Sequence, residues 1–107
     1  MAHLTSYQMY IDGKWVDASS GRSFESLNPA NEEAWAKLPD ADVADVDRAV
    51  AAAHKAFTEG PWTKMTATER GRCLRRLADL LAQHSESLGR IETIDTGKLF
   101  KETRWQA

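Results

Sequence analysis

Cysteine is nearly absent from this sequence, and its scarcity excludes two common ways of stabilising a small protein. Cys73 is the single cysteine among 107 residues, which rules out an internal disulfide and a zinc site built from several cysteines. A run of about 18 apolar residues, as in a membrane-spanning helix, is also missing. The chain does not begin with the basic and apolar regions of a signal peptide. We therefore expect a cytoplasmic protein.

An excess of charge of one sign is missing too. Lysine and arginine number 14 against 16 aspartates and glutamates, which gives a formal net charge of −2. Proteins that bind nucleic acid usually carry a clustered basic excess, so neither a nucleic acid nor a membrane is expected as a partner. A chain of this length has room for one domain.

The sequence contains no glycine-rich phosphate loop and no group of residues with the spacing of a catalytic or metal site. The lone cysteine lies on an apolar helical stripe, so we expect it to pack in the core rather than act as a nucleophile. We interpret the histidines as ordinary surface or boundary residues. The arginines of residues 70–76 are interpreted as the solvated face of an amphipathic helix rather than as a phosphate site. These residues are His3, His54, His84, Arg70, Arg72, Arg75 and Arg76. The residues alone therefore assign no catalytic and no cofactor-binding position.

Short segments that favour β-strands come first along the chain. Met9–Val16 contains two such segments around Asp12-Gly13, a pair typical of a tight hairpin turn. Ser23–Leu27 is a further candidate strand, which is followed by a turn at Asn28-Pro29. Glu33–Leu38 alternates apolar and polar residues, as a half-buried strand does.

Two amphipathic helices follow the strands. Asp42 and Thr66 are candidate N-terminal caps, Thr66 with Glu69 in a capping-box spacing, and Gly60-Pro61 ends the first helix. The apolar stripe of the first helix is Val43, Val46, Ala49, Val50, Ala53 and Phe57; that of the second is Cys73, Leu74, Leu77, Leu80 and Leu81. The predicted strands are too few and too short to cover both stripes.

A third helix is expected to end at Gly97, and a further helix to open at Leu99 without any closing residue. The pattern as a whole predicts an α/β protein with a hairpin followed by amphipathic helices. We expect the chain to be truncated at residue 107, and residues 1–8 to be flexible.

Five segments, taken in order, resemble the amino-terminal end of the NAD(P)-dependent aldehyde dehydrogenases. They are Ile11–Trp15, Leu27–Ala30, Asp45–Ala53, Arg70–Leu81 and the Glu-x-x-Asp-x-Gly-Lys pattern of Glu92–Lys98. The resemblance implies that residues 9–107 are an incomplete outer part of a Rossmann-like cofactor-binding domain. It also implies that every catalytic and cofactor-binding residue lies outside this chain.

The activity that the resemblance implies for the whole enzyme is oxidation of an aldehyde to a carboxylic acid. In that family a cysteine thiolate adds to the carbonyl to give a thiohemiacetal, hydride passes to NAD or NADP, and water activated by a glutamate hydrolyses the thioester. Cys73 is in the wrong segment for that cysteine. The chain alone is expected to be inactive and to hold no cofactor, whereas the full-length enzyme is expected to form a dimer or tetramer.

The resemblance further implies a structural site for a monovalent cation, bound through oxygen atoms. The matching positions are Ser26, Leu27 and Asp95, with a further ligand beyond Ala107. The alternative is that these residues simply form a capped turn and a helix end.

Two other classes of function remain open on the residues themselves. One is a small helical interaction module without catalytic activity, which would form a cooperative, monodisperse fold by itself. The other is a small helical DNA-binding protein, which the balanced charge disfavours.

Overall fold

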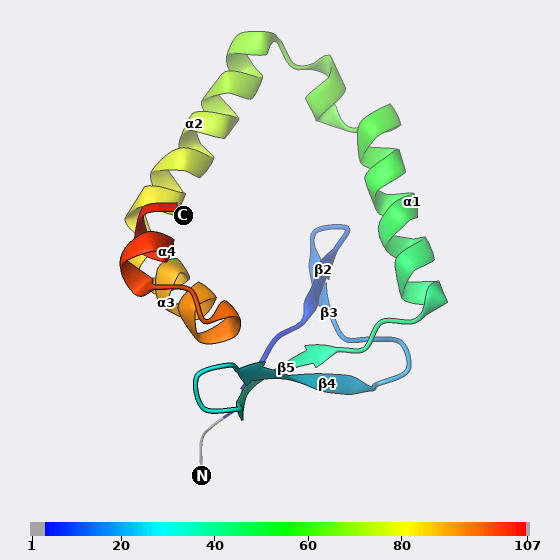
Figure 1. The fold of residues 1–107 in the computed structure, drawn as a ribbon. Helices are drawn as coiled ribbons and strands as arrows, with labels where there is room; N and C mark the ends of the chain where they lie inside the picture. Colours follow the sequence, from blue (N-terminus) through cyan, green and yellow to red (C-terminus); the bar gives the residue numbers. More distant parts are fainter. Residues whose placement is uncertain (1–3, 107) are drawn as a thin grey trace. The chain divides into compact units, whose positions relative to one another are not determined.

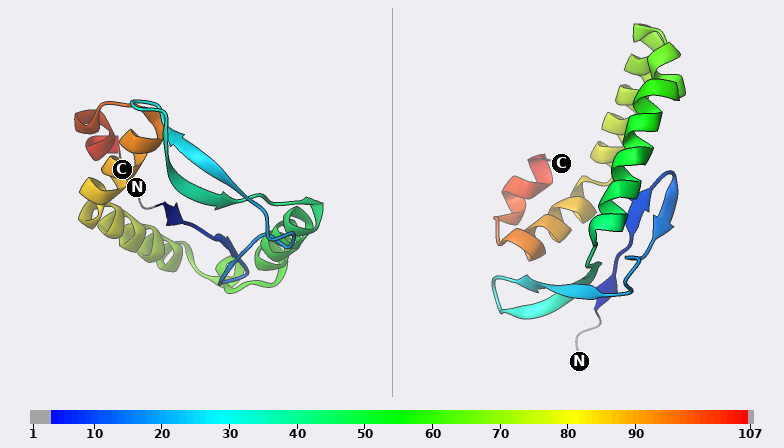
Figure 2. Two further views of the ribbon diagram at one scale, coloured as in Figure 1. Left: turned by 90° about the horizontal axis from the view of Figure 1, so that it is seen from below. Right: turned by 90° about the vertical axis from the view of Figure 1, so that its right-hand side faces the viewer.

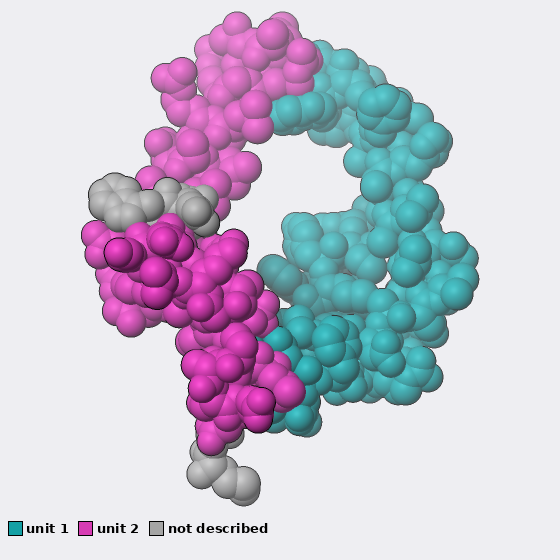
Figure 3. Space-filling model, viewed as in Figure 1, with its two compact units in different colours: residues 1–26, 34–65 teal, residues 27–33, 66–107 magenta. Residues whose placement is uncertain are grey.

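The computed structural model describes residues 4–106 of the chain, which divides into two compact units (Figure 3). Unit 1 comprises residues 1–26 and 34–65, and unit 2 comprises residues 27–33 and 66–107. Both strands and helices are present, as the sequence predicts, so the mixed α/β class is confirmed. The elements are drawn in Figure 1.

The predicted hairpin is present in unit 1. Strand β2 (Met9–Ile11) pairs antiparallel with β3 (Lys14–Val16). At the turn between them, Asp12 and Gly13 both adopt positive φ angles, 53° and 74°, as a two-residue turn of this kind requires.

A second sheet has the strand order β1-β5-β4. Strand β5 (Glu33–Pro39) lies in the middle, between β4 (Ser23–Asn28) and the short β1 (Thr5–Ser6), which pairs with it in parallel. The alternation predicted for β5 is confirmed, since Ala36 is fully buried and its neighbours on the same face are half-buried. Strand β1 was not predicted from the sequence.

Helix α1 (Val43–Glu59) begins at the predicted cap, Asp42, and ends at Gly60, before the short 3-10 helix η1 (Pro61–Lys64). Asp45, in the first turn of α1, is only 1% exposed, and its carboxylate accepts several hydrogen bonds. The backbone N–H of Asp42 donates to it at 3.1 Å, and that of Ser19 donates to both of its oxygens, each at 3.1 Å. The guanidinium of Arg48 pairs with it as well. Asp45 therefore fastens the loop around Ser19 to the start of α1.

Unit 2 contains helices α2 (Ala67–Gln83), α3 (Ser85–Thr96) and α4 (Phe100–Gln106). The capping box predicted for α2 is confirmed, since the backbone N–H of Glu69 donates to the Thr66 hydroxyl at 3.2 Å and the Glu69 carboxylate accepts from the Thr66 N–H at 2.7 Å. The predicted end of α3 at Gly97 is confirmed too.

Helices α3 and α4 lie side by side (Figure 2), and a buried hydroxyl joins them. Thr103 on α4 is fully buried, and its hydroxyl donates to the Gly89 carbonyl of α3 at 2.9 Å. The hydroxyl oxygen of Thr93 lies 3.0 Å from the hydroxyl oxygen of Thr103. A buried polar group needs such partners, and here they hold the last described helix to the one before it.

Large apolar side chains of α1 and α2 remain exposed. Among residues 4–104, whose side-chain burial the structure describes, the buried hydrophobic residues are Ala18 and Ala36. Cys73, which we expected in the core, is exposed. The apolar face of α2 on which it lies is not packed against other residues closely enough to bury any of its side chains. In the part of the chain that the structure describes, no helix is both long and apolar enough to cross a membrane.

The hydrogen bonds to Asp45 predict a loss of stability in acid. Burial of the carboxyl raises its pKa, but the hydrogen bonds from Asp42, Arg48 and Ser19 outweigh this and lower the pKa from 3.8 to about 2. The folded chain therefore binds this proton less readily than the unfolded chain does. The contribution of Asp45 to the free energy of unfolding is complete above pH 3.8 and is lost as the pH falls towards about 2.

Urea unfolding followed by circular dichroism checks this prediction. Asp45→Asn should lower the free energy of unfolding at neutral pH and should flatten its decline in acid. Asp47→Asn, at an exposed position of the same helix, is the control and should preserve both. If the free energy of unfolding declined in acid as steeply in Asp45→Asn as in the unchanged chain, the stabilising role assigned to the Asp45 carboxylate would be contradicted.

Candidate functional site

The Asn-Pro turn of unit 2 is held by hydrogen bonds of its own residues. The Asn28 side-chain oxygen accepts from the N–H of Ala30 at 2.9 Å. The Asn28 carbonyl accepts from the N–H groups of Asn31 at 3.3 Å and Glu32 at 2.7 Å. An asparagine that bonds the backbone two residues on is the usual chemistry of such a turn, so the sequence fixes its local shape.

The same turn contacts the end of α3. Gly97 has a φ of 76°, and a Cβ placed on it would lie 3.0 Å from Cγ of Pro29. Glycine therefore satisfies two requirements at this position, the left-handed backbone that closes a helix and the close approach of the proline ring. The structure thus brings together two of the segments that carry the family resemblance, Leu27–Ala30 and Glu92–Lys98.

The Glu-x-x-Asp-x-Gly-Lys segment also closes on itself. The ammonium of Lys98 lies 2.9 Å from the carboxylate of Glu92, and the Lys98 N–H donates to the Thr96 hydroxyl at 3.3 Å. The two charged side chains are 54% and 33% exposed, so the ion pair adds little stability. The ion pair nevertheless gives the Lys98 ammonium a partner in α3, the helix that precedes its loop.

The residues named for a cation site lie near these segments. Leu27 is an exposed residue of β4, and Asp95 is an exposed residue in the last turn of α3, both in unit 2. Ser26, the residue before Leu27 in β4, belongs to unit 1. Among the residues with a described placement, no group of at least three histidine, cysteine, aspartate or glutamate side chains could hold a metal ion.

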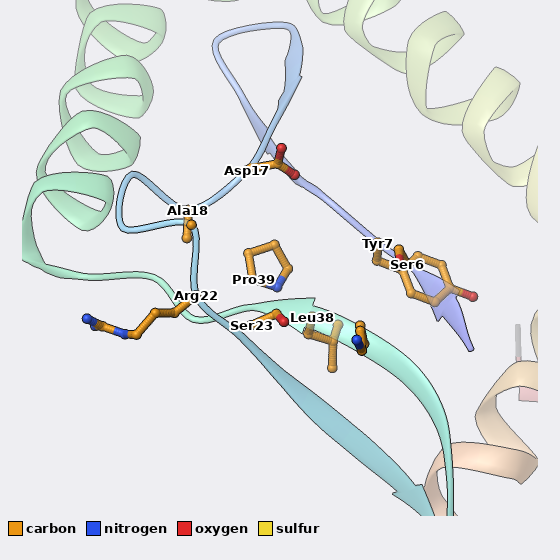
Figure 4. Close-up of a pocket in the computed structure, with 10 residues that line it drawn as sticks. Ser6, Tyr7, Asp17, Ala18, Arg22, Ser23, Leu38 and Pro39 are labelled. Carbon is orange, nitrogen blue, oxygen red and sulfur yellow. The ribbon is translucent and has the colours of Figure 1, made fainter. Parts of the chain in front are cut away.

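A hollow of about 270 Å³ lies in unit 1 between the loop after β3 and strands β1 and β5 (Figure 4). Two of its charged groups are already engaged, because Asp17 accepts from Gln8 at 3.0 Å and Arg22 pairs with Asp40 at 3.3 Å. Ligand pockets usually measure about 300–1,000 Å³ and have an apolar lining. The hollow is slightly smaller than such a pocket, and its lining is a mixture of polar and apolar groups.

The other polar residues considered from the sequence are mostly exposed where the structure describes them. His54 lies on α1 and His84 at the end of α2, both exposed, and His3 lies outside the described residues. Three of the four arginines of α2, at positions 72, 75 and 76, are exposed, as expected for a solvated face, and Arg70 is half-buried.

Comparison with known proteins yields a consistent match. The family model for the aldehyde dehydrogenase family matches residues 15–107. The chain is 47% identical over 96 residues to aldehyde dehydrogenase family 2 member B4, mitochondrial, of Arabidopsis thaliana, which covers 90% of this chain and 18% of that protein. It spans between 10% and 21% of the length of the curated relatives considered.

Solved structures agree with the sequence comparison. The NAD-dependent aldehyde dehydrogenase from Sinorhizobium meliloti superimposes with a TM-score of 0.92 at 40% identity, over 97% of this chain and 21% of that one. An NAD+ complex of an aldehyde dehydrogenase from Bacillus cereus gives a TM-score of 0.86 at 42% identity, over 90% of this chain and 20% of that one.

The contact between Pro29 and Gly97 generates a prediction for stability. Gly97→Ala should lower the free energy of unfolding by about 1–2 kcal/mol, because alanine disfavours the left-handed backbone and its Cβ would crowd the proline ring. Gly71→Ala is the matched control. Gly71 lies within α2 with nothing within 4 Å of an added Cβ, so this change should stabilise the helix by about 0.5–1 kcal/mol. Equal effects in urea unfolding would contradict the prediction.

Proposed function

The chain belongs to the aldehyde dehydrogenase family, and on this premise we propose that it is the amino-terminal segment of the cofactor-binding domain of an NAD(P)-dependent aldehyde dehydrogenase. The observation that carries this proposal is the match of nearly the whole chain to about a fifth of a solved family member. The contact between the Asn-Pro turn and the glycine after α3 supports it, because the two segments that meet there both carry the resemblance.

We propose that the whole enzyme oxidises an aldehyde to a carboxylic acid, with NAD or NADP as the hydride acceptor. The sequence has no glycine-rich phosphate loop, the feature that commonly holds the pyrophosphate of a dinucleotide. No step of the reaction is therefore assigned to the described residues. Their role is structural: they supply an outer part of a Rossmann-like domain whose reacting groups lie elsewhere.

A cytoplasmic location and a dimer or tetramer of the whole enzyme complete the proposal. Both rest on what is usual in the family, and an aldehyde is the one partner that the chemistry requires. The balanced charge of the chain supports the expectation that nucleic acid and membrane are not partners.

We also propose that Ser26, Leu27 and Asp95 contribute to a structural site for a monovalent cation in the whole enzyme. Carbonyl and carboxylate oxygens are suitable ligands for a hard cation. The packing of Pro29 on Gly97 supports the idea, since it holds the turn that follows Leu27 at the end of the helix that carries Asp95.

Because a further ligand is expected outside residues 1–107, the chain alone should not respond specifically to sodium. Its midpoint of thermal unfolding should be the same in sodium chloride and in choline chloride at equal ionic strength. Stabilisation that is specific to sodium, and that Asp95→Ala removes, would instead show that these residues complete a site by themselves.

The purified 107-residue chain should show no oxidation of aldehydes that depends on NAD or NADP. The measurement is absorbance of the reduced nicotinamide with a panel of aliphatic and aromatic aldehydes. The Sinorhizobium meliloti enzyme serves as the positive control. Turnover by the pure chain would overturn the structural role given to it here.

The coding sequence beyond codon 107 and the intact mass of the native product test the proposal itself. A reading frame that continues into Rossmann-type strands and a later cysteine motif would support it. A native chain that ends at Ala107 would contradict it.

A further inference from the structure

Helix α1 has one face in use and one face uncovered within unit 1. Alanines line the groove between α1 and the turn of the hairpin, where Tyr10 and Ile11 form the other wall. A neighbouring face carries larger side chains spaced three, four and seven residues apart. This valine face of α1 consists of Val43, Val46, Val50 and Phe57, which are 76%, 54%, 62% and 74% exposed.

Helix α2 presents a comparable surface in unit 2. Its leucine face consists of Leu74, Leu77 and Leu81, which are 58%, 52% and 39% exposed. The helix is 17 residues long and has no buried residue. Most helices in proteins gain their stability from packing of an apolar face rather than from helix propensity alone. The leucine face would therefore be stabilised by another apolar surface that packs against it.

Exposure on this scale is unusual for a protein that acts alone. Single exposed apolar residues are common, but contiguous apolar patches on a monomer are rarely larger than a few hundred Å² and usually mark an interaction site. Each of these faces is a regular helical stripe rather than a scatter of residues. Each has the pattern of a helix that packs into an apolar groove.

The solved relatives indicate what covers the two faces. The backbone of this chain superimposes on a part of the Sinorhizobium meliloti enzyme, and it covers 21% of that polypeptide. Most of that polypeptide thus lies outside the match. Resting on the function proposed above, we propose that the valine face of α1 and the leucine face of α2 are docking surfaces for the remaining part of an aldehyde dehydrogenase polypeptide. We further propose that the 107-residue chain binds this part when it is supplied as a separate polypeptide.

Co-expression tests the proposal directly. The tagged 107-residue chain is produced together with a Sinorhizobium meliloti enzyme from which the matching segment has been deleted. The tag is then used for purification, and the mass of the product is measured by light scattering after size exclusion. The expected result is a soluble complex with one copy of each polypeptide, held in solution by the chain.

Charge substitutions within each face identify the surfaces. Val46→Asp and Leu77→Asp should each reduce recovery of the partner at least tenfold. Ala51→Asp on α1 and Ala82→Asp on α2 are matched controls. Both alanines are exposed, outside the two apolar faces, and the change in charge is the same. Circular dichroism should show equal helix content in all four variants, because every substituted side chain is exposed.

Several results would overturn the proposal. The deleted enzyme could stay insoluble in the presence of the chain, or be soluble without being retained by it. The chain could form a dimer that excludes the deleted enzyme, which would assign the faces to a second copy. Binding that Val46→Asp and Leu77→Asp leave intact would also refute it.

Activity is measured separately on any complex that forms. Docking without aldehyde oxidation would count against the proposed function and leave the docking surfaces standing. Failure to dock would count against the surfaces alone, since the family match does not depend on association between separate chains.

Discussion

Hydrogen bonds at the ends of helices and in turns, rather than a hydrophobic core, define the elements of this chain. The clearest case is Asp45, whose carboxylate joins the loop at Ser19 to the first turn of α1 while it also bonds the N–H of Asp42. Thr66 and Glu69 do the same for α2, and the Thr103 hydroxyl joins α4 to α3. The bonds to the N–H groups of Asp42 and Thr66 lie at helix starts, where backbone N–H groups lack partners within the helix, whereas Thr103 bonds a carbonyl within α3. The elements are therefore well defined although few apolar side chains are buried.

Those local bonds explain which parts of the fold are visible in the sequence. The hairpin turn at Asp12-Gly13, the cap at Thr66 and the end of α3 at Gly97 depend on residues at most a few positions apart, so the printed sequence contains everything needed to predict them. The exposure of Cys73 depends instead on what packs against α2, and no pattern within a helix can reveal that. Strand β1 is only two residues long and has no periodicity to recognise.

The candidate site shows the same division. The resemblance to a family supplied Leu27 and Asp95 as positions, but the meeting of their segments is a contact between Pro29 and Gly97 that is remote in the sequence. The part of Asp45 in capping α1 was easier to predict, because Asp42-x-x-Asp45 has the spacing of a capping box. Its burial was not predictable, since that depends on the return of the loop that contains Ser19.

The packing of α3 on α4 has a consequence for folding during synthesis. These two helices are separated by a short connection, and contacts between neighbours in sequence form quickly because little chain entropy is lost in closing the loop. A ribosome that has released this segment thus carries a helix pair that has already formed. On the docking proposed above, the valine face of α1 and the leucine face of α2 stay exposed until the covering polypeptide has been made, and during that interval the nascent chain is open to aggregation and to chaperones.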